Sequence, residues 1–240
     1  MSDLLEYVLA EHGGRERWQS VRTLEVHVSV GGGMWQLKGW AGALADARFS
    51  IDAQTQHVEF TRATEPGRRS IYEPGRTATV TEGGELVEQR ESPRDAFNGH
   101  VRATPWDAQQ LIYFAGYAMW TYLTTPFLLV LPGVRTDEIE PWSGEGEVWR
   151  RLKVVFPSSI HSHSREQTFY FDSSGLLRRQ DYSVDIMGGT SSAHYASDHE
   201  SFSGLIFPTR RRVFTIGEGN LPLRDRVGVS IDILDLEVQR

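Results

Sequence analysis

The sequence predicts a mainly β fold (α+β) in which a single antiparallel curved sheet wraps around a helical insert. The first observation is an apolar, aromatic run, residues 108–134, that contains no Asp, Glu, Lys, Arg or His. The second is that segments alternating between apolar and polar residues, the period of β-strands, lie on both sides of this run. Because the strands must bury the insert, we expect a half-barrel of about 11–13 strands around it. No stretch resembles a linker, so a single domain over residues 1–240 is expected.

Two short helical segments are predicted before the first strand. The start of the chain predicts a helix that is capped by Ser2, presents Leu5 and Leu9 on one face and ends at Gly13-Gly14. Residues 15–20 predict a further helical turn.

The rest of the chain, apart from the insert, is predicted to be a meander of strands separated by Gly, Pro or short polar turns. Gly31-Gly-Gly33 is expected to be one of these turns, and because no helix is expected after it, it lacks the features of a phosphate-binding loop. The predicted strands are residues 21–30, 34–40, 44–53, 57–62, 68–72, 77–81, 85–90, 134–139, 148–156, 165–171, 176–186, 194–202, 206–215 and 227–238.

The insert, about residues 105–131, predicts two helices. Thr104 is expected as the N-cap of the first, with Pro105 at its first position and Asp107 in its first turn, where a carboxylate favours the helix dipole. A second, short helix is expected to begin with Thr125 as its cap and Pro126 at its first position.

A membrane span is the alternative interpretation of the insert. Residues 111–131 are 21 in number, enough to cross a bilayer. However, Pro126 interrupts the run, threonines and tyrosines dilute its hydrophobicity, and basic residues do not cluster at its ends. We therefore expect a buried helical hairpin and no integral membrane segment.

Composition limits the classes of partner and site. The net charge of −7 argues against nucleic acid as a partner, because phosphate binding usually needs a basic surface. The chain has no cysteine, which excludes disulfides, thiolate nucleophiles and cysteine-based zinc sites. The N-terminus has no cationic region and carries acids within its apolar stretch, so we expect no secretory signal. We therefore expect a cytoplasmic location.

Three segments carry a resemblance to a known family. Residues 11–24 contain a helix end, Gly-Gly and the start of the first strand; residues 169–186 read as a hairpin; and residues 202–210 contain Gly-Leu-Ile-Phe-Pro-Thr. Together these segments resemble the lipoprotein-sorting (Lol-type) β half-barrel superfamily. The resemblance implies an incomplete antiparallel barrel whose concave face, lidded by helices, holds acyl chains or other hydrophobic ligands. No export signal is expected at its start, and the sequence contains no cysteine for a lipid anchor, so we expect the fold of that family rather than a lipoprotein-carrier role.

Aromatic residues are the candidates for ligand binding. Tyr113, Tyr117 and Trp120 share one face of the insert helix. They either fill the half-barrel as core or line a pocket in which their polar groups orient a ligand. Trp35 and Trp40, in a regular strand, would face opposite sides, so only one of them could line the cavity. The opposite face of the insert helix carries Leu111, Ala115, Ala118 and Tyr122. The full candidate ligand-binding set is Trp35, Trp40, Trp106, Tyr113, Tyr117, Trp120 and Phe127.

Histidines are the candidates for chemistry. A histidine beside a carboxylate in an apolar pocket has a useful pKa, and an arginine could hold an anionic or enolate oxygen. The candidate catalytic residues are His163, Arg165, Tyr195, His199, Asp198 and Asp181. No metal or other cofactor is predicted, since zinc needs more ligands than one histidine pair supplies; the candidate ligands, if a metal were bound, are His161, His163 and His194.

Two arginine groups, Arg178-Arg179 and Arg210-Arg-Arg212, are expected to be solvated charges on edge strands. The sequence as a whole predicts binding of a small hydrophobic or aromatic molecule in a cavity between the concave sheet and the insert. One alternative is a cofactor-independent enzyme (an isomerase, cyclase, lyase or hydrolase) that uses His, Arg and Tyr in that cavity. A second is a protein-interaction module whose insert docks a partner. These alternatives stay open, as does the oligomeric state.

Overall fold

A computed structural model of the protein describes residues 3–62, 64–144 and 146–240. Its strands are β1 (Thr23–Gly31), β2 (Ala47–Asp52), β3 (Val58–Phe60), β4 (Arg68–Glu73), β5 (Arg76–Thr81), β6 (Leu86–Glu91), β7 (Arg135–Gly144), β8 (Glu147–Val155), β9 (Glu166–Phe171), β10 (Leu177–Val184), β11 (Thr190–Phe202), β12 (Leu205–Thr215) and β13 (Val229–Gln239).

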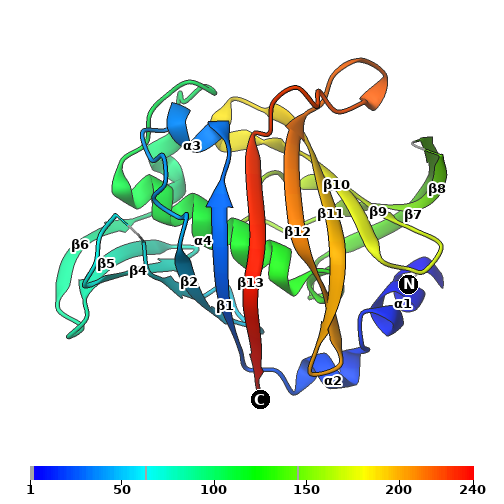
Figure 1. The fold of residues 1–240 in the computed structure, drawn as a ribbon, viewed down its shortest axis with the longest axis horizontal. Coiled ribbons are helices and arrows are strands. Elements are labelled where there is room, and N and C mark those ends of the chain that lie inside the picture. The colour runs from blue at the N-terminus through cyan, green and yellow to red at the C-terminus, as the bar shows by residue number, and fades with distance from the viewer. Residues whose placement is uncertain (1–2, 63, 145) are drawn as a thin grey trace.

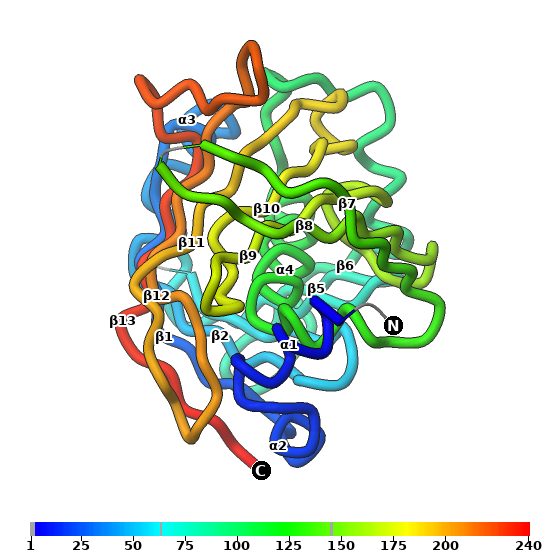
Figure 2. Tube along the Cα trace, turned by 90° about the vertical axis from the view of Figure 1, so that its right-hand side faces the viewer, coloured from blue at the N-terminus to red at the C-terminus, as the bar shows by residue number. Residues whose placement is uncertain are grey.

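All 13 strands belong to one antiparallel sheet, in the order β6-β5-β4-β3-β2-β1-β13-β12-β11-β10-β9-β8-β7. The sheet is open and curved, and its two ends are β6 and β7 (Figures 1 and 2). The predicted mainly β fold, an antiparallel curved sheet around a helical insert, is confirmed. The pairing of β1 with β13 joins the first and last strands of the chain in the middle of the sheet.

The helix α4 (Ala108–Thr124) lies within the curve of the sheet in both views (Figures 1 and 2). Its chain neighbours in the sheet are β6 and β7, the two ends of the sheet, and the connection between them crosses the sheet on its concave side (Figures 1 and 2). Every residue from Gln109 to Thr124 is buried. A helix that is apolar on all sides is stable only when it is covered on all sides, which the curved sheet achieves.

The start of α4 differs from the prediction. Asp107, not Thr104, is the N-cap: its side chain accepts a hydrogen bond from Gln110 N at 2.9 Å, and Gln110 Oε1 accepts one from Asp107 N at 2.9 Å. This reciprocal pair is a capping box, which satisfies two of the otherwise free N–H groups at a helix start. Thr104 instead caps the preceding loop, where its hydroxyl accepts from Val101 N at 3.0 Å.

The end of α4 follows from Pro126. Thr125, the residue before the proline, is extended, as sterics at that position favour. Instead of a second α-helix with Thr125 as its cap, a single 3-10 turn, η2 (Phe127–Val130), follows with Pro126 in the capping position. The other 3-10 turns are η1 (Pro93–Phe97), η3 (Asp185–Met187) and η4 (Glu218–Asn220).

The N-terminal helices α1 (Asp3–Glu11) and α2 (Arg15–Gln19) are present as predicted, while the expected cap Ser2 lies outside the described residues. They lie at the end of the sheet where the β11–β12 hairpin turns (Figure 1). Trp18 of α2 stacks on Phe127, with ring centroids 4.5 Å apart, and so covers the turn that follows α4. Gly13 is required at the junction, because its φ is 111° and a Cβ would lie 2.4 Å from Gly204 O.

The predicted strand 34–40 is wrong. Residues Gly33–Leu37 form a short helix, α3, so a helix does follow the Gly31-Gly-Gly33 turn. Gly32 has a φ of 106°, and a Cβ there would lie 2.5 Å from Gly228 O, so the chain turns while in close contact with the start of β13. The alternation of apolar and polar residues over five positions fits one helical turn as well as a strand.

Among the described residues, no helix combines the length and the apolar character needed to cross a membrane.

Helix α4 lies tightly against Tyr72 of the sheet at Gly116. A Cβ at this position would lie 2.2 Å from Cγ of Tyr72 in β4. We expect Gly116→Ala to lower the free energy of unfolding by about 1–3 kcal/mol, although alanine is the better helix former, because the ring or the helix must shift. Urea denaturation measures this. The control is Gly75→Ala, where a Cβ meets nothing within 4 Å; equal stability of both variants would contradict the proposed contact.

Candidate functional site

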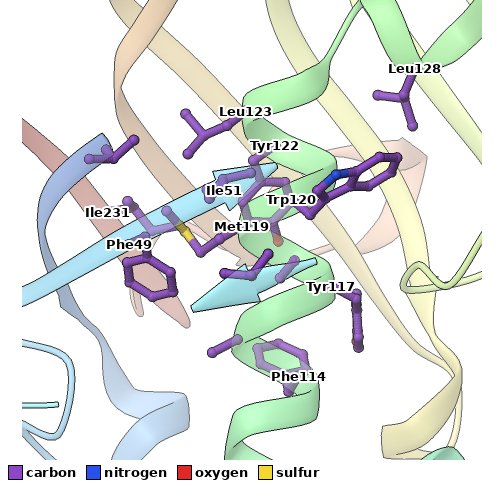
Figure 3. Close-up of a cluster of buried hydrophobic side chains, with 14 of the residues drawn as sticks. Phe49, Ile51, Phe114, Tyr117, Met119, Trp120, Tyr122, Leu123, Leu128 and Ile231 are labelled. Atoms are coloured by element: carbon purple, nitrogen blue, oxygen red, sulfur yellow. The ribbon is translucent and has the colours of Figure 1, made fainter. Parts of the chain in front are cut away.

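A cavity of about 640 Å³ lies between one side of α4 and the concave face of the sheet. This volume is in the range of pockets that bind small organic ligands. The strands that contribute to its wall are β1, β2 and β10–β13, and α3 contributes as well. The lining side chains from α4 are Phe114, Ala115, Ala118, Met119 and Tyr122. Figure 3 shows Met119 pointing toward Phe49 and Ile231, which line the cavity, while Tyr117 and Trp120 point away from them.

One end of the cavity reaches the surface. The lining residues there come from α3 and from the segment 223–228, which lie at the same end of the molecule (Figure 1). Leu37 and Leu223 are about half exposed at this end, with relative accessibilities of 47% and 50%. Arg102, Asp225 and Arg226 add charges to the rim. The opening therefore carries both apolar and charged side chains.

The wall beside Tyr122 carries a chain of hydrogen bonds. The hydroxyls of Tyr117 and Tyr122 lie 3.1 Å from Nδ1 and 2.6 Å from Nε2 of His163. Tyr122 is also 3.1 Å from the hydroxyl of Tyr182, which lies 3.4 Å from Nδ1 of His194. His163 is stacked on Tyr182 with ring centroids 4.1 Å apart. These contacts hold three cavity-lining groups, His163, Tyr122 and Tyr182, in one fixed arrangement.

This hydrogen-bonded wall is neutral. Burial, reinforced by Arg94, lowers the pKa of His163 to about 3. Burial also lowers the pKa of His194 and raises that of Tyr122 to about 12. A neutral imidazole has one donor and one acceptor, so His163 donates to one tyrosine and accepts from the other. The wall offers hydrogen bonds to a polar atom of a ligand but brings no charge of its own.

The structure separates the predicted ligand-binding residues into two groups. Trp35 lines the cavity. Tyr113, Tyr117 and Trp120, on the face of α4 that points away from the cavity, are packed in the core. Their polar atoms have protein partners: Trp120 Nε1 donates to Asp52 O at 3.0 Å, and the hydroxyl of Tyr113 lies 2.9 Å from Nδ1 of His161. The predicted residues that are absent from the lining are Trp40, Trp106, Tyr113, Tyr117, Trp120 and Phe127. The lining face of α4 is instead the one that carries Ala115, Ala118 and Tyr122.

The predicted catalytic residues do not meet in one place. His163 lines the cavity, whereas Arg165 is exposed. Asp198 is exposed and lies 3.5 Å from Arg210. His199 is half-buried near Arg211, and burial lowers its pKa to about 4. A catalytic role for any of these residues stays a prediction.

The remaining two predicted catalytic residues, Asp181 and Tyr195, surround Arg179. Asp181 is adjacent to the cavity-lining Tyr182 in β10 and therefore faces the opposite side of the sheet. Arg179 Nε lies 2.6 Å from Asp181 Oδ1, and its Nη1 donates to the hydroxyl of Tyr195 at 3.3 Å. This cluster is an ion pair packed among aromatic rings, away from the cavity.

Each of the three candidate metal ligands has at least one ring nitrogen within hydrogen-bond distance of a tyrosine hydroxyl, for His194 its Nδ1 at 3.4 Å from Tyr182. Both ring nitrogens of His163 lie within hydrogen-bond distance of tyrosine hydroxyls, and His161 Nδ1 is 2.9 Å from Tyr113. Within residues 3–62, 64–144 and 146–240, no three His, Cys, Asp or Glu side chains come together in a way that could hold a metal ion.

The expectation that the arginine groups are solvated edge charges is wrong for two of their members. Strand β12, which carries Arg211, lies between β11 and β13, and β10, which carries Arg179, lies between β9 and β11. Arg179 is 0% and Arg211 2% exposed. Because the sequence does not show which strands are at the edge, the alternation of charge in these strands was compatible with either position.

The fold is similar to solved structures. A LolA superfamily protein from Nitrosomonas europaea matches with a TM-score of 0.55 at 10% identity, over 98% of this chain and 92% of that chain. A DUF1329 family protein from Desulfovibrio piger matches with a TM-score of 0.54 at 11% identity, over 98% of this chain and 92% of that chain. No family model and no curated protein matches the sequence. At these identities the comparisons show a shared fold, and they confirm the structural side of the resemblance to lipoprotein-sorting proteins.

The buried histidines generate a prediction about pH. Burial lowers the pKa of His12 and His199 to about 4 and that of His163 to about 3. An unfolded chain binds protons at histidine below pH of about 6.5, whereas these folded sites do not, so the unfolded state gains protons as the pH falls. We therefore expect the free energy of unfolding to decrease steeply from about pH 6.5 to pH 5, by up to about 1.4 kcal/mol per pH unit for each such histidine.

Urea denaturation at a series of pH values tests this expectation. His163→Gln should reduce the slope of stability against pH by about one proton. Tyr182→Phe removes a hydroxyl next to His163 but no imidazole, so it should lower stability at every pH and keep the slope. A wild-type stability that does not change over this pH range would contradict the assignment of neutral buried histidines.

Proposed function

We propose that the protein binds a small hydrophobic molecule in the cavity between α4 and the concave face of the sheet. The observation that carries this proposal is the cavity itself: about 640 Å³, bounded mainly by apolar side chains, and open at one end. Protein interiors are normally packed to the density of organic crystals, so a space of this size costs stability unless a ligand fills it.

The chemistry of the wall supports a hydrophobic ligand with a polar group. Phe114 and Met119 of α4 and Phe49 of β2 provide apolar surface from the helix and from the sheet. Among the polar groups of the lining, Tyr122, Tyr182 and His163 lie together and are joined by hydrogen bonds. A few convergent polar groups in an apolar pocket are typical of sites that fix the orientation of a small molecule. The fold shared with a LolA superfamily protein, whose family the sequence resembles, supports the same proposal.

Filling the cavity tests this proposal. Ala118 faces the cavity from α4 and is 4% exposed, so Ala118→Trp should occupy the space that a ligand needs. We expect the purified protein to bind Nile red, an uncharged hydrophobic dye, and Ala118→Trp to weaken this binding by about tenfold or more, which corresponds to about 1.4 kcal/mol. Dye fluorescence measures the affinity.

The matched control is Ala10→Trp, an equal substitution at an exposed position of α1. Ser192→Phe approaches the same cavity from β11 and serves as a second variant if Ala118→Trp does not fold. Circular dichroism and thermal unfolding verify the fold of each. Dye binding that is unaffected by both filling variants would show that the cavity is not the binding site.

A further inference from the structure

Arg211 lies beside the inner end of the cavity. In β12 it is two residues from Val213, and in the register of β12 with β13 it is directly opposite Ile231. Val213 and Ile231 both line the cavity. Residues two apart on a strand, and residues directly opposite on neighbouring strands, point to the same face of a sheet. The side chain of Arg211 is therefore next to the cavity lining on the concave face, although it is not itself part of that lining.

Arg211 uses only part of its hydrogen-bonding capacity. Its Nη2 donates to the backbone oxygen of Tyr122 at 2.8 Å, and its guanidinium carbon lies 5.2 Å from the centre of the Tyr122 ring. Tyr122 is in the last turn of α4, where a cation is favourable for the free carbonyl groups and the helix dipole. This contact provides a hydrogen-bond acceptor for Nη2. It leaves Nε and Nη1, both buried, without a hydrogen-bond partner among the described residues.

The charge of Arg211 is also uncompensated by any acid. In the part of the chain that the structure describes, no carboxylate lies within ion-pair distance of it, and the groups that raise its pKa are the tyrosines 122 and 182. Burial lowers the pKa of Arg211 to about 10, so the group is still a cation at neutral pH. The titratable groups around it are His12, His194 and His199, whose pKa values are lowered by burial and further by Arg211 itself.

The other buried cations of the described chain differ from Arg211. Arg179 donates to both carboxylate oxygens of Asp181, at 2.6 and 2.9 Å. Arg62 pairs with Glu65. Lys38 has no acidic partner among the described residues either, but its Nζ donates to two backbone oxygens, that of Arg102 at 2.8 Å and that of Thr104 at 3.0 Å. Arg211 alone among these combines full burial, no acidic partner and two nitrogens without a partner.

A second donor lies next to Arg211. His194 is directly opposite Val213 in the register of β11 with β12, so it points to the same face of the sheet, next to the lining although not itself part of it. Its Nδ1 is 3.4 Å from the hydroxyl of Tyr182, while its Nε2 has no partner. When Nδ1 accepts the tyrosine proton, Nε2 carries a hydrogen that is free to donate. Leaving such groups unpaired in an apolar interior is costly, and an anion that accepts from them removes the cost.

We propose that Arg211, with His194 as second donor, binds the anionic head of the ligand, so that the cavity selects long-chain carboxylic acids over uncharged molecules of the same length. This inference rests on the proposed hydrophobic binding function and names its ligand class. The carboxylate accepts hydrogen bonds from Arg211 Nε or Nη1 and from His194 Nε2, and the alkyl chain lies along the apolar wall between α4 and β13. Hydrogen bonds between two charged groups are shorter and about twice as strong as neutral ones, which makes the head group the source of selectivity.

Competition between two ligands of equal chain length tests the proposal. Dodecanoate and 1-dodecanol are titrated against bound Nile red at pH 7.5, in the wild type and in Arg211→Met. We expect the wild type to bind the acid at least about tenfold more tightly than the alcohol, and Arg211→Met to lose this difference by a weaker affinity for the acid alone. Arg210→Met, a substitution of the exposed neighbour, is the control and should keep the wild-type preference.

The outcomes separate this inference from the proposed function. Equal affinities for acid and alcohol in the wild type, or an acid preference that persists in Arg211→Met, would overturn the role of Arg211 and leave the cavity function intact. A wild type that binds neither Nile red nor either competitor would overturn the function itself. If Arg211→Met does not fold, Arg211→Lys replaces the planar group by a compact ammonium: a lower affinity for the acid alone supports the proposal, and an equal loss for both ligands contradicts it.

Discussion

The burial of α4 is the constraint on which the rest of the structure depends. The helix is apolar on every side, so it cannot rest on a flat sheet with one side exposed to water. The connection that contains it joins β6 to β7, which are the two ends of the sheet, and crosses the sheet on its concave side (Figures 1 and 2). The sheet curves around the helix and remains open, because the segment between its two edges occupies the interior. At Gly116 the helix lies so close to Tyr72 of β4 that a side chain would not fit without a shift.

The cavity follows from the difference between the two sides of α4. One side carries Tyr113, Tyr117 and Trp120, which are 0–1% exposed and fill the space toward the sheet and the loop that contains His161 and His163. The other side carries the small residues Ala115 and Ala118 opposite β1 and β13. The large side chains on one side set the position of the helix. The small side chains on the other side do not fill the space that remains between the helix and the sheet. Packing of the aromatic residues and the presence of a cavity are thus two results of the same arrangement.

Much of the fold could be predicted from sequence because strand and helix periods are local signals. The alternation of apolar residues located the strands of the sheet, and the uncharged run located α4, each to within a few residues. Local signals failed where two interpretations fit the same few residues: the segment around Trp35 is too short to distinguish a helical turn from a strand, and Asp107 and Thr104 are both good caps.

The site was harder to predict because it depends on which parts of the chain become neighbours. The sequence showed two faces of the insert helix but not which one meets the unfilled side of the sheet. His163 and Trp35 were recognised as candidates and do line the cavity, while Tyr182 and Arg211 belong to strands whose place in the sheet is set by the pairing of β1 with β13. The charge pattern of β12 could not reveal a buried arginine, because a central strand and an edge strand can carry the same alternation.

The contrast between the neutral wall and Arg211 limits what the cavity can recognise. Desolvation keeps His163 and His194 uncharged and the tyrosines protonated, so these groups contribute hydrogen bonds without a preference for the sign of a ligand's charge. A buried arginine is expensive compared with an apolar residue of similar size, and here the C-terminal carbonyl of α4 compensates it only in part. The residue that fixes the end of α4 to β12 is therefore also the source of positive potential at the inner end of the cavity. An anion bound there would lie beside the contact that holds the helix, which places ligand recognition and the position of α4 at the same residue.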